Sequence, residues 1–169
     1  FMRESQGFFP EDASGLSINE MRNCYDRLCA HFHGGRPEGM QVAGMTAPGP
    51  AGDIALRRYV PRGARDGAGL IYLHGGGYVL GSLDSHDDVC AGLAELSGAT
   101  VIAVDYRLAP EHRFPAAFED CAAAVQHTGT AGAQGSRMLR GVQAVAGGFD
   151  AVHLDIRVRN EGMKQAQRI

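Results

Sequence analysis

The sequence predicts an α/β domain with a mostly parallel sheet and crossover helices. Two apolar segments, 70–73 and 100–104, lack the alternation of a half-exposed strand and are typical of strands buried on both faces. A helical pattern over 84–96 separates them, and a second helix over 115–127 opens on a proline. Strand, helix, strand and helix in this order favour parallel strands joined by helices.

The N-terminal part predicts a helix and a hairpin ahead of these strands. Ser17 and Glu20 form a capping box, and apolar residues at helical spacing then indicate a helix over 17–32. Segments 40–46 and 53–60 predict two strands joined by a Pro/Gly turn, an antiparallel edge with one side exposed to water. Residues 1–16 are polar and predict a loose arm.

Composition limits the possible functions. A chain of 169 residues supports one domain with a real core, and a net charge of −3 argues against nucleic acid as a partner. No apolar run approaches the length of a membrane span, and no leader pattern opens the chain. We expect no cofactor and a cytoplasmic location, with free thiols at all four cysteines, namely Cys24, Cys29, Cys90 and Cys121. Because the chain opens on Phe1, we also expect a fragment.

The strand at 70–73 ends in the most informative motif, His74-Gly75-Gly76-Gly77. Three residues without a Cβ directly after a buried strand let backbone N–H groups face a ligand that side chains would otherwise block. The alternative is a glycine-rich turn that binds nothing.

Longer motifs around this turn resemble the hormone-sensitive-lipase-like carboxylesterases of the α/β-hydrolase fold. The similarity covers roughly residues 15–126 and rests on segments 58–61, 74–82, 105–112, 114–117 and 119–120. It implies a partial α/β-hydrolase fold over 17–127, with the helix at 17–32 as a cap over an acyl pocket. It also implies hydrolysis of small-molecule carboxylic esters by a serine, an aspartate and a histidine.

The resemblance assigns roles to the glycine turn, the oxyanion loop at 74–81. Gly76 and Gly77 would donate hydrogen bonds to the oxyanion of a tetrahedral intermediate, and Gly75 would make the turn. His74 would orient the loop by side-chain hydrogen bonds rather than transfer protons. In the 105–112 segment, we expect Arg107 to pair with Glu111.

The nucleophile that this family requires is missing from the sequence. No Gly-x-Ser-x-Gly occurs, and the closest register places Phe149 where the serine belongs. Asp150, Ser82, Ser85 and Ser136 are poor substitutes, because none combines an elbow of small residues with a base. The tail at 128–169 therefore predicts a divergent, possibly frame-altered segment, and the acid and histidine of a triad would follow residue 169.

Several alternatives remain open at this level. The chain could be an inactive carboxylesterase-family fragment or a non-catalytic small-molecule-binding module on the same fold. His31 and His33, or His86 with Asp87 and Asp88, could bind a metal, although a polar helix end and first-turn electrostatics explain them better. If residues 141–147 supply no strand, the 70–73 strand would have an unpaired edge and the chain would self-associate.

Overall fold

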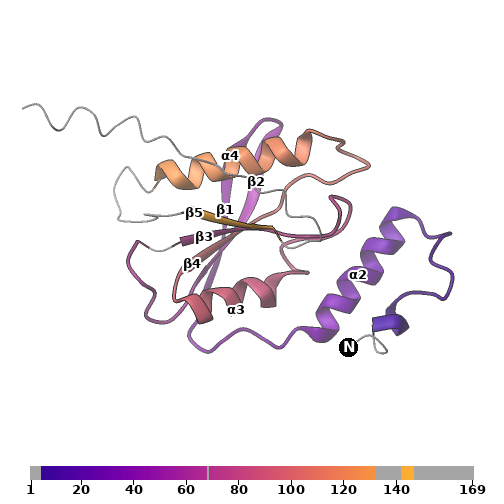
Figure 1. Cartoon of the computed structure of the whole chain (residues 1–169), viewed down its shortest axis with the longest axis horizontal. Coiled ribbons are helices and arrows are strands. Elements are labelled where there is room, and N and C mark those ends of the chain that lie inside the picture. The colour runs from indigo at the N-terminus through magenta and orange to yellow at the C-terminus, as the bar shows by residue number, and fades with distance from the viewer. Residues whose placement is uncertain (1–4, 68, 132–141, 147–169) are drawn as a thin grey trace, which may run out of the picture.

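The computed structural model describes residues 5–67, 69–131 and 142–146, which form a five-stranded sheet with a helix on each face. In Figure 1, α4 lies above the sheet, α3 lies below it, and α2 stands to one side. The strands are β1 (Gln41–Gly49), β2 (Gly52–Val60), β3 (Gly69–Leu73), β4 (Thr100–Val104) and β5 (Val142–Ala146). The helices are η1 (Gln6–Phe8), α2 (Ile18–Phe32), α3 (Asp87–Ser97) and α4 (Ala116–Ala131).

The sheet order is β1-β2-β4-β3-β5, and its two halves differ in direction. β3 pairs in parallel with β4 and with β5, as expected for strands joined by crossover helices. β1 pairs antiparallel with β2, and β2 pairs antiparallel with β4. The predicted hairpin is therefore present, and it continues the sheet beside β4.

Alternating side chains of the central strands form two hydrophobic cores. Ile71, Ile102 and Val104 face the α4 side, where they pack with Ala124. Tyr72, Val101 and Ala103 face the α3 side, in the second cluster. All five residues of β4 are buried, which confirms its prediction as a central strand covered on both faces.

The helices begin and end near the predicted residues, with one instructive difference. The capping box of α2 is formed: the Ser17 side chain accepts from the Glu20 N–H, and the Glu20 carboxylate accepts from the Ser17 N–H. α3 begins at Asp87 rather than at residue 84. The hydroxyl groups of Ser82 and Ser85 instead accept hydrogen bonds from each other's backbone N–H, at 3.1 and 2.8 Å, within the preceding loop.

The condition stated for an unpaired edge at β3 is not met, because residues 142–146 do supply a strand. β5 pairs with β3 over its whole length, from Gly69 opposite Val142 to Leu73 opposite Ala146. The sequence pattern did not predict this strand, because its hydrophobic periodicity is weak. Backbone hydrogen bonds form its pairing with β3 and require no particular side chains. The open edge on this side of the described sheet is β5, and self-association itself stays a prediction.

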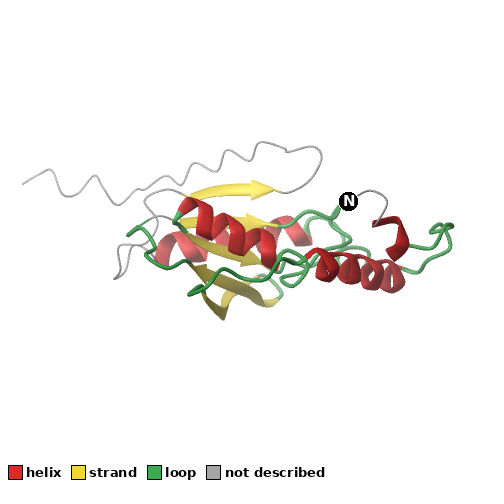
Figure 2. Ribbon diagram, turned by 90° about the horizontal axis from the view of Figure 1, so that it is seen from below, coloured by secondary structure: helices red, strands yellow, loops and turns green. Residues whose placement is uncertain are grey.

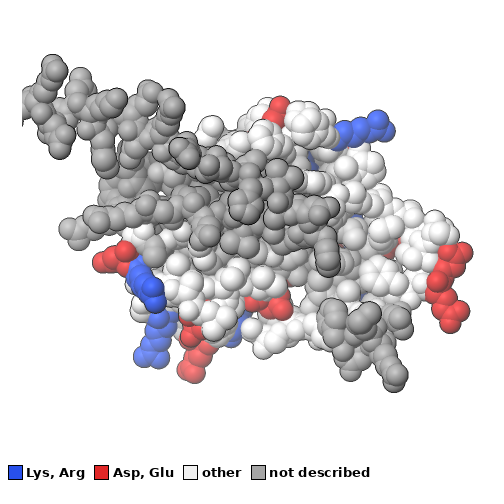
Figure 3. All heavy atoms as spheres, in the orientation of Figure 1, with Lys and Arg blue, Asp and Glu red and all other residues white. Residues whose placement is uncertain are grey.

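The described surface carries charges of both signs. On the face that Figure 3 shows, acidic and basic side chains lie in small groups among uncharged atoms.

Within the described ranges, no helix has the length and apolar character to cross a membrane. All four cysteines are free thiols, with Cys24 and Cys90 buried.

Candidate functional site

The glycine turn lies where the parallel strands end. Leu73 pairs with Val104, so the segments that follow β3 and β4 leave the sheet at the same edge. α2 lies beyond this edge, on the side to which the strand arrowheads point in Figure 2. Open α/β sheets generally bind their ligands at this edge.

His74 is buried and holds the start of the turn. Its Nδ1 lies 2.9 Å from the Gly75 carbonyl oxygen, so the neutral ring donates this hydrogen bond. The Tyr106 hydroxyl donates to the His74 carbonyl oxygen at 2.5 Å, and the two rings stack with centroids 4.2 Å apart. Burial lowers the pKa of His74 and outweighs the bond to Gly75 and the charge of Asp105, which raise it. The His74 ring is therefore neutral and contacts both the Gly75 carbonyl oxygen and the Tyr106 ring.

The N–H groups of Gly76 and Gly77 in this turn are available to a ligand. The carbonyl oxygen of Gly76 accepts from the Val79 N–H at 3.1 Å and from the Leu80 N–H at 2.9 Å. Gly76 and Gly77 have positive φ angles of 119° and 62°. Among the described residues, neither glycine N–H has a hydrogen-bond partner, so both can donate to a ligand.

Steric crowding explains why two positions of this loop require glycine. A Cβ on Gly76 would overlap the Leu80 carbonyl oxygen, and a Cβ on Gly81 would overlap the His74 ring. Gly81 also has a positive φ of 102°. A Cβ on Gly77 would meet open space, so only its backbone conformation favours glycine there.

A second cluster centres on Asp87, which is only 3% exposed. Its carboxylate accepts hydrogen bonds from Arg36 at 2.7 and 2.8 Å, from Arg57 at 3.0 Å and from the Tyr59 hydroxyl at 2.9 Å. His33 Nε2 lies 3.0 Å from the same carboxylate. Asp87 therefore joins the segment after α2 to β2 and α3, a larger role than the predicted first-turn electrostatics.

The histidines expected as metal alternatives have other neighbours. His31 packs against the rings of Phe8 and Phe32, with centroids 5.0 and 4.9 Å away, and His33 pairs with Asp87. In the part of the chain that the structure describes, no group of three His, Cys, Asp or Glu residues could hold a metal ion.

The prediction that Arg107 pairs with Glu111 is wrong. Arg107 instead binds the buried Asp120 of α4 through its backbone N–H at 3.0 Å and its guanidinium at 2.8 and 2.9 Å. Glu111 binds Arg22 of α2 at 2.8 and 2.9 Å. Proximity in sequence suggested the wrong pair, because the better-positioned carboxylate comes from the following helix.

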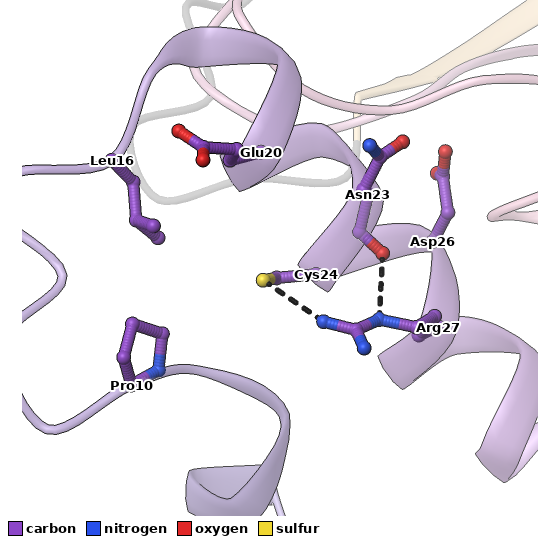
Figure 4. Close-up of a pocket in the computed structure, with 7 residues that line it drawn as sticks. All are labelled: Pro10, Leu16, Glu20, Asn23, Cys24, Asp26 and Arg27. Carbon is purple, nitrogen blue, oxygen red and sulfur yellow. Dashed lines mark hydrogen bonds between the residues drawn. The ribbon is translucent and has the colours of Figure 1, made fainter.

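One hollow of the described structure lies away from the glycine turn. It has a volume of about 720 Å³ and lies between the N-terminal arm and α2 (Figure 4). Arg27 fills part of its wall and bonds back to the Asn23 carbonyl oxygen and the Cys24 sulfur of its own helix. A second hollow of about 440 Å³ lies between α2 and the start of α3, where His33 and Asp87 meet.

His86 provides a pH-dependent prediction. Its ring stacks on His74 with centroids 5.3 Å apart, and burial lowers the pKa of His86 to about 4. In the unfolded chain a histidine has a pKa of about 6.5, so between about pH 4 and pH 6.5 the unfolded chain binds more protons than the folded one. The free energy of unfolding should therefore fall as the pH drops from about 6.5 to about 4. His86→Gln should flatten this part of a plot of melting temperature against pH. An unchanged slope would contradict the assignment.

The remaining candidates fall into two groups. Ser82 and Ser85 bond to each other's backbone, and Ser85 Oγ also lies 2.9 Å from His86 Nδ1. Ser136, Phe149 and Asp150 lie outside the described residues.

Sequence reasoning missed the contact of Tyr106 with His74. The position of Tyr106, two residues after a buried strand, was the available signal.

Comparisons with known proteins identify the fold family of this chain. A model of the alpha/beta hydrolase fold matches residues 70–165. Esterase LipI of Mycobacterium tuberculosis is 40% identical over 129 residues, which are 73% of this chain and 40% of LipI.

Solved structures agree. An esterase of Pyrobaculum calidifontis superposes with a TM-score of 0.70 at 34% identity, covering 85% of this chain and 47% of that one. An esterase from the bacterial hormone-sensitive lipase family gives a TM-score of 0.67 at 29% identity, covering 85% and 44%. The chain thus spans less than half the length of these relatives.

Proposed function

The chain belongs to the alpha/beta hydrolase fold family, with hormone-sensitive-lipase-like esterases among its relatives, and we propose that it carries the oxyanion-binding part of a carboxylic ester hydrolase. The observation behind this proposal is the pair of unpartnered N–H groups on Gly76 and Gly77 at the carboxyl edge of the parallel strands. The substrate would be a small-molecule ester, as the names of the relatives suggest.

Each part of the site has a role in this proposal. Nucleophilic attack on an ester turns its carbonyl oxygen into an oxyanion, and the N–H groups of Gly76 and Gly77 would stabilise the negative charge. Neutral His74, bonded to Gly75 and stacked on Tyr106, would keep the turn in place before the substrate arrives. α2, beyond the same edge, would cover the acyl group.

A chimera tests the oxyanion role. Residues 1–126 of this chain would replace the matching part of the Pyrobaculum calidifontis esterase, which would supply the remainder of an esterase. Gly76→Ala should lower kcat about 10²–10³-fold, because its Cβ overlaps the Leu80 carbonyl oxygen and displaces a donor. Steady-state hydrolysis of p-nitrophenyl butyrate measures the effect.

Gly92→Ala is the matched control for this chimera. Gly92 lies within α3, and a Cβ there would meet nothing within 4 Å, so kcat should stay unchanged. A folded Gly76→Ala chimera with more than a tenth of the parental kcat would contradict the oxyanion role.

A non-catalytic binding module is the second candidate, favoured by the absence of Gly-x-Ser-x-Gly from the sequence. This candidate requires that the 169-residue chain itself binds an ester such as ethyl butyrate and melts at a higher temperature in its presence.

We also propose a cytoplasmic location, which the four free thiols support.

A further inference from the structure

One arginine of α2 touches both loops at the carboxyl edge of the sheet. Arg22 donates from Nε to the Val79 carbonyl oxygen at 2.9 Å and from Nη2 to the Ala109 carbonyl oxygen at 2.9 Å. It also binds both carboxylate oxygens of Glu111. Because its side chain is only 23% exposed, these bonds are partly shielded from water.

The bond to Val79 acts on the peptide that closes the glycine turn. The peptide between Val79 and Leu80 accepts from Arg22 at its carbonyl oxygen and donates to the Gly76 carbonyl oxygen through its N–H. Both ends of this peptide plane are therefore held, so it cannot rotate without breaking one of the two bonds.

The preceding peptide, between Tyr78 and Val79, is held in the same way. Its N–H donates to the Gly76 carbonyl oxygen, and its carbonyl oxygen accepts from the Ala109 N–H at 2.8 Å. The carbonyl oxygen of Ala109 is itself an acceptor for Arg22. Both peptide planes that close on Gly76 thus depend on one guanidinium, directly or through Ala109.

We propose that Arg22 is a positioning residue that couples the place of α2 to the geometry of the glycine turn. The functional meaning of this coupling rests on the proposed oxyanion role: the Gly76 and Gly77 N–H groups are in position only while α2 is docked. The planar fork is essential, because a lysine ammonium cannot reach acceptors on two loops in the same arrangement.

Amide hydrogen exchange of the 169-residue chain tests the coupling without any ester. Arg22→Gln should accelerate exchange in a peptide covering 76–81 by about tenfold or more, because the turn loses its charge-assisted bond to Val79. Exchange in β2 and β4 should stay at the parental rate. Mass spectrometry of peptic fragments resolves these segments.

The chain offers a matched control on the same helix. Arg27 bonds only to Asn23 and Cys24 within α2 in the described structure, so Arg27→Gln should leave exchange of 76–81 unchanged. Arg22→Lys keeps the charge but loses the fork, and it should fail to restore slow exchange. Glu111→Gln keeps an acceptor for Arg22, and its turn should exchange at close to the parental rate.

Three results would overturn the proposal: equal exchange of 76–81 in Arg22→Gln and Arg27→Gln, restoration by Arg22→Lys, or uniform acceleration across the sheet. The last result, like outright unfolding of Arg22→Gln and Arg22→Lys, would assign Arg22 to general stability. In the chimera, a fall in kcat with little change in KM is expected for Arg22→Gln and not for Arg27→Gln. An active Gly76→Ala chimera would end the oxyanion role but leave the exchange result standing.

Discussion

The purified 169-residue chain is expected to hydrolyse p-nitrophenyl butyrate about 10⁶-fold more slowly than an intact esterase. The sequence contains no Gly-x-Ser-x-Gly, and loss of a serine–histidine unit in serine hydrolases costs about this factor in turnover. In the proposed oxyanion role, the Gly76 and Gly77 N–H groups would leave a rate roughly 10³–10⁴-fold above the reaction in water.

The chimera described above is the positive control, because it contains the same glycine turn together with an esterase remainder. Labelling of the 169-residue chain by a fluorophosphonate, together with turnover at ordinary enzymatic rates, would show that another residue acts as nucleophile. Ser85, with its hydroxyl 2.9 Å from His86 Nδ1, would then be the first residue to replace by alanine.

Asp87→Asn is expected to lower the free energy of unfolding by about 3 kcal/mol. Removing one partner of a buried ion pair costs about 3–5 kcal/mol, since the remaining charges lose their compensation. The lower end applies here because the Arg36 side chain is 45% exposed and stays hydrated. Urea unfolding at pH 7 measures the difference.

Asp84→Asn is the control for this substitution. Asp84 also pairs with Arg57, at 2.7 Å, but its side chain is 85% exposed, so the change should stay below about 1 kcal/mol. Equal effects of the two substitutions on the free energy of unfolding would contradict the stabilising role of the buried Asp87 carboxylate.

Acid should remove the difference between wild type and Asp87→Asn. Burial raises the pKa of Asp87, but hydrogen bonds from Arg36, His33 and Tyr59 outweigh it and hold the pKa well below its usual range. A carboxylate with a lowered pKa stabilises the folded state at pH values above its pKa in the unfolded chain, about 3.9. This stabilisation is lost as the pH falls through the pKa of the folded state. The two unfolding free energies should therefore begin to converge below about pH 4 and become equal only as the pH falls through the folded pKa of Asp87.

The local structure of the chain could be predicted well from sequence. The capping box at Ser17 and the apolar run of β4 each depend on neighbouring residues alone. The position of the glycine turn followed from the same logic, because three glycines end a buried strand. The long co-linear resemblance then predicted the fold family, which the match over 70–165 confirms.

The pairings between distant residues could not be predicted in this way. Arg107 binds Asp120 rather than Glu111, because α4 brings a buried carboxylate to the loop. The sequence left open whether residues 141–147 form a strand, and β5 pairs with β3 through a backbone ladder that needs no particular side chains. Arg22 reaches residues 57 to 89 positions away, and no spacing in the sequence indicates such a contact.

The sequence by itself determined the family, the elements around the glycine turn and the lack of a recognisable nucleophile. These depend on local patterns: strand hydrophobicity, caps, and glycines where a Cβ does not fit. Only the tertiary structure decided how the turn is held, with Tyr106 on His74 and Arg22 against two loops. It also decided that Asp87 lies between two arginines from other parts of the chain. Hydrogen bonds and ion pairs form wherever folding brings donors and acceptors within about 3 Å, and that proximity is a property of the packed chain.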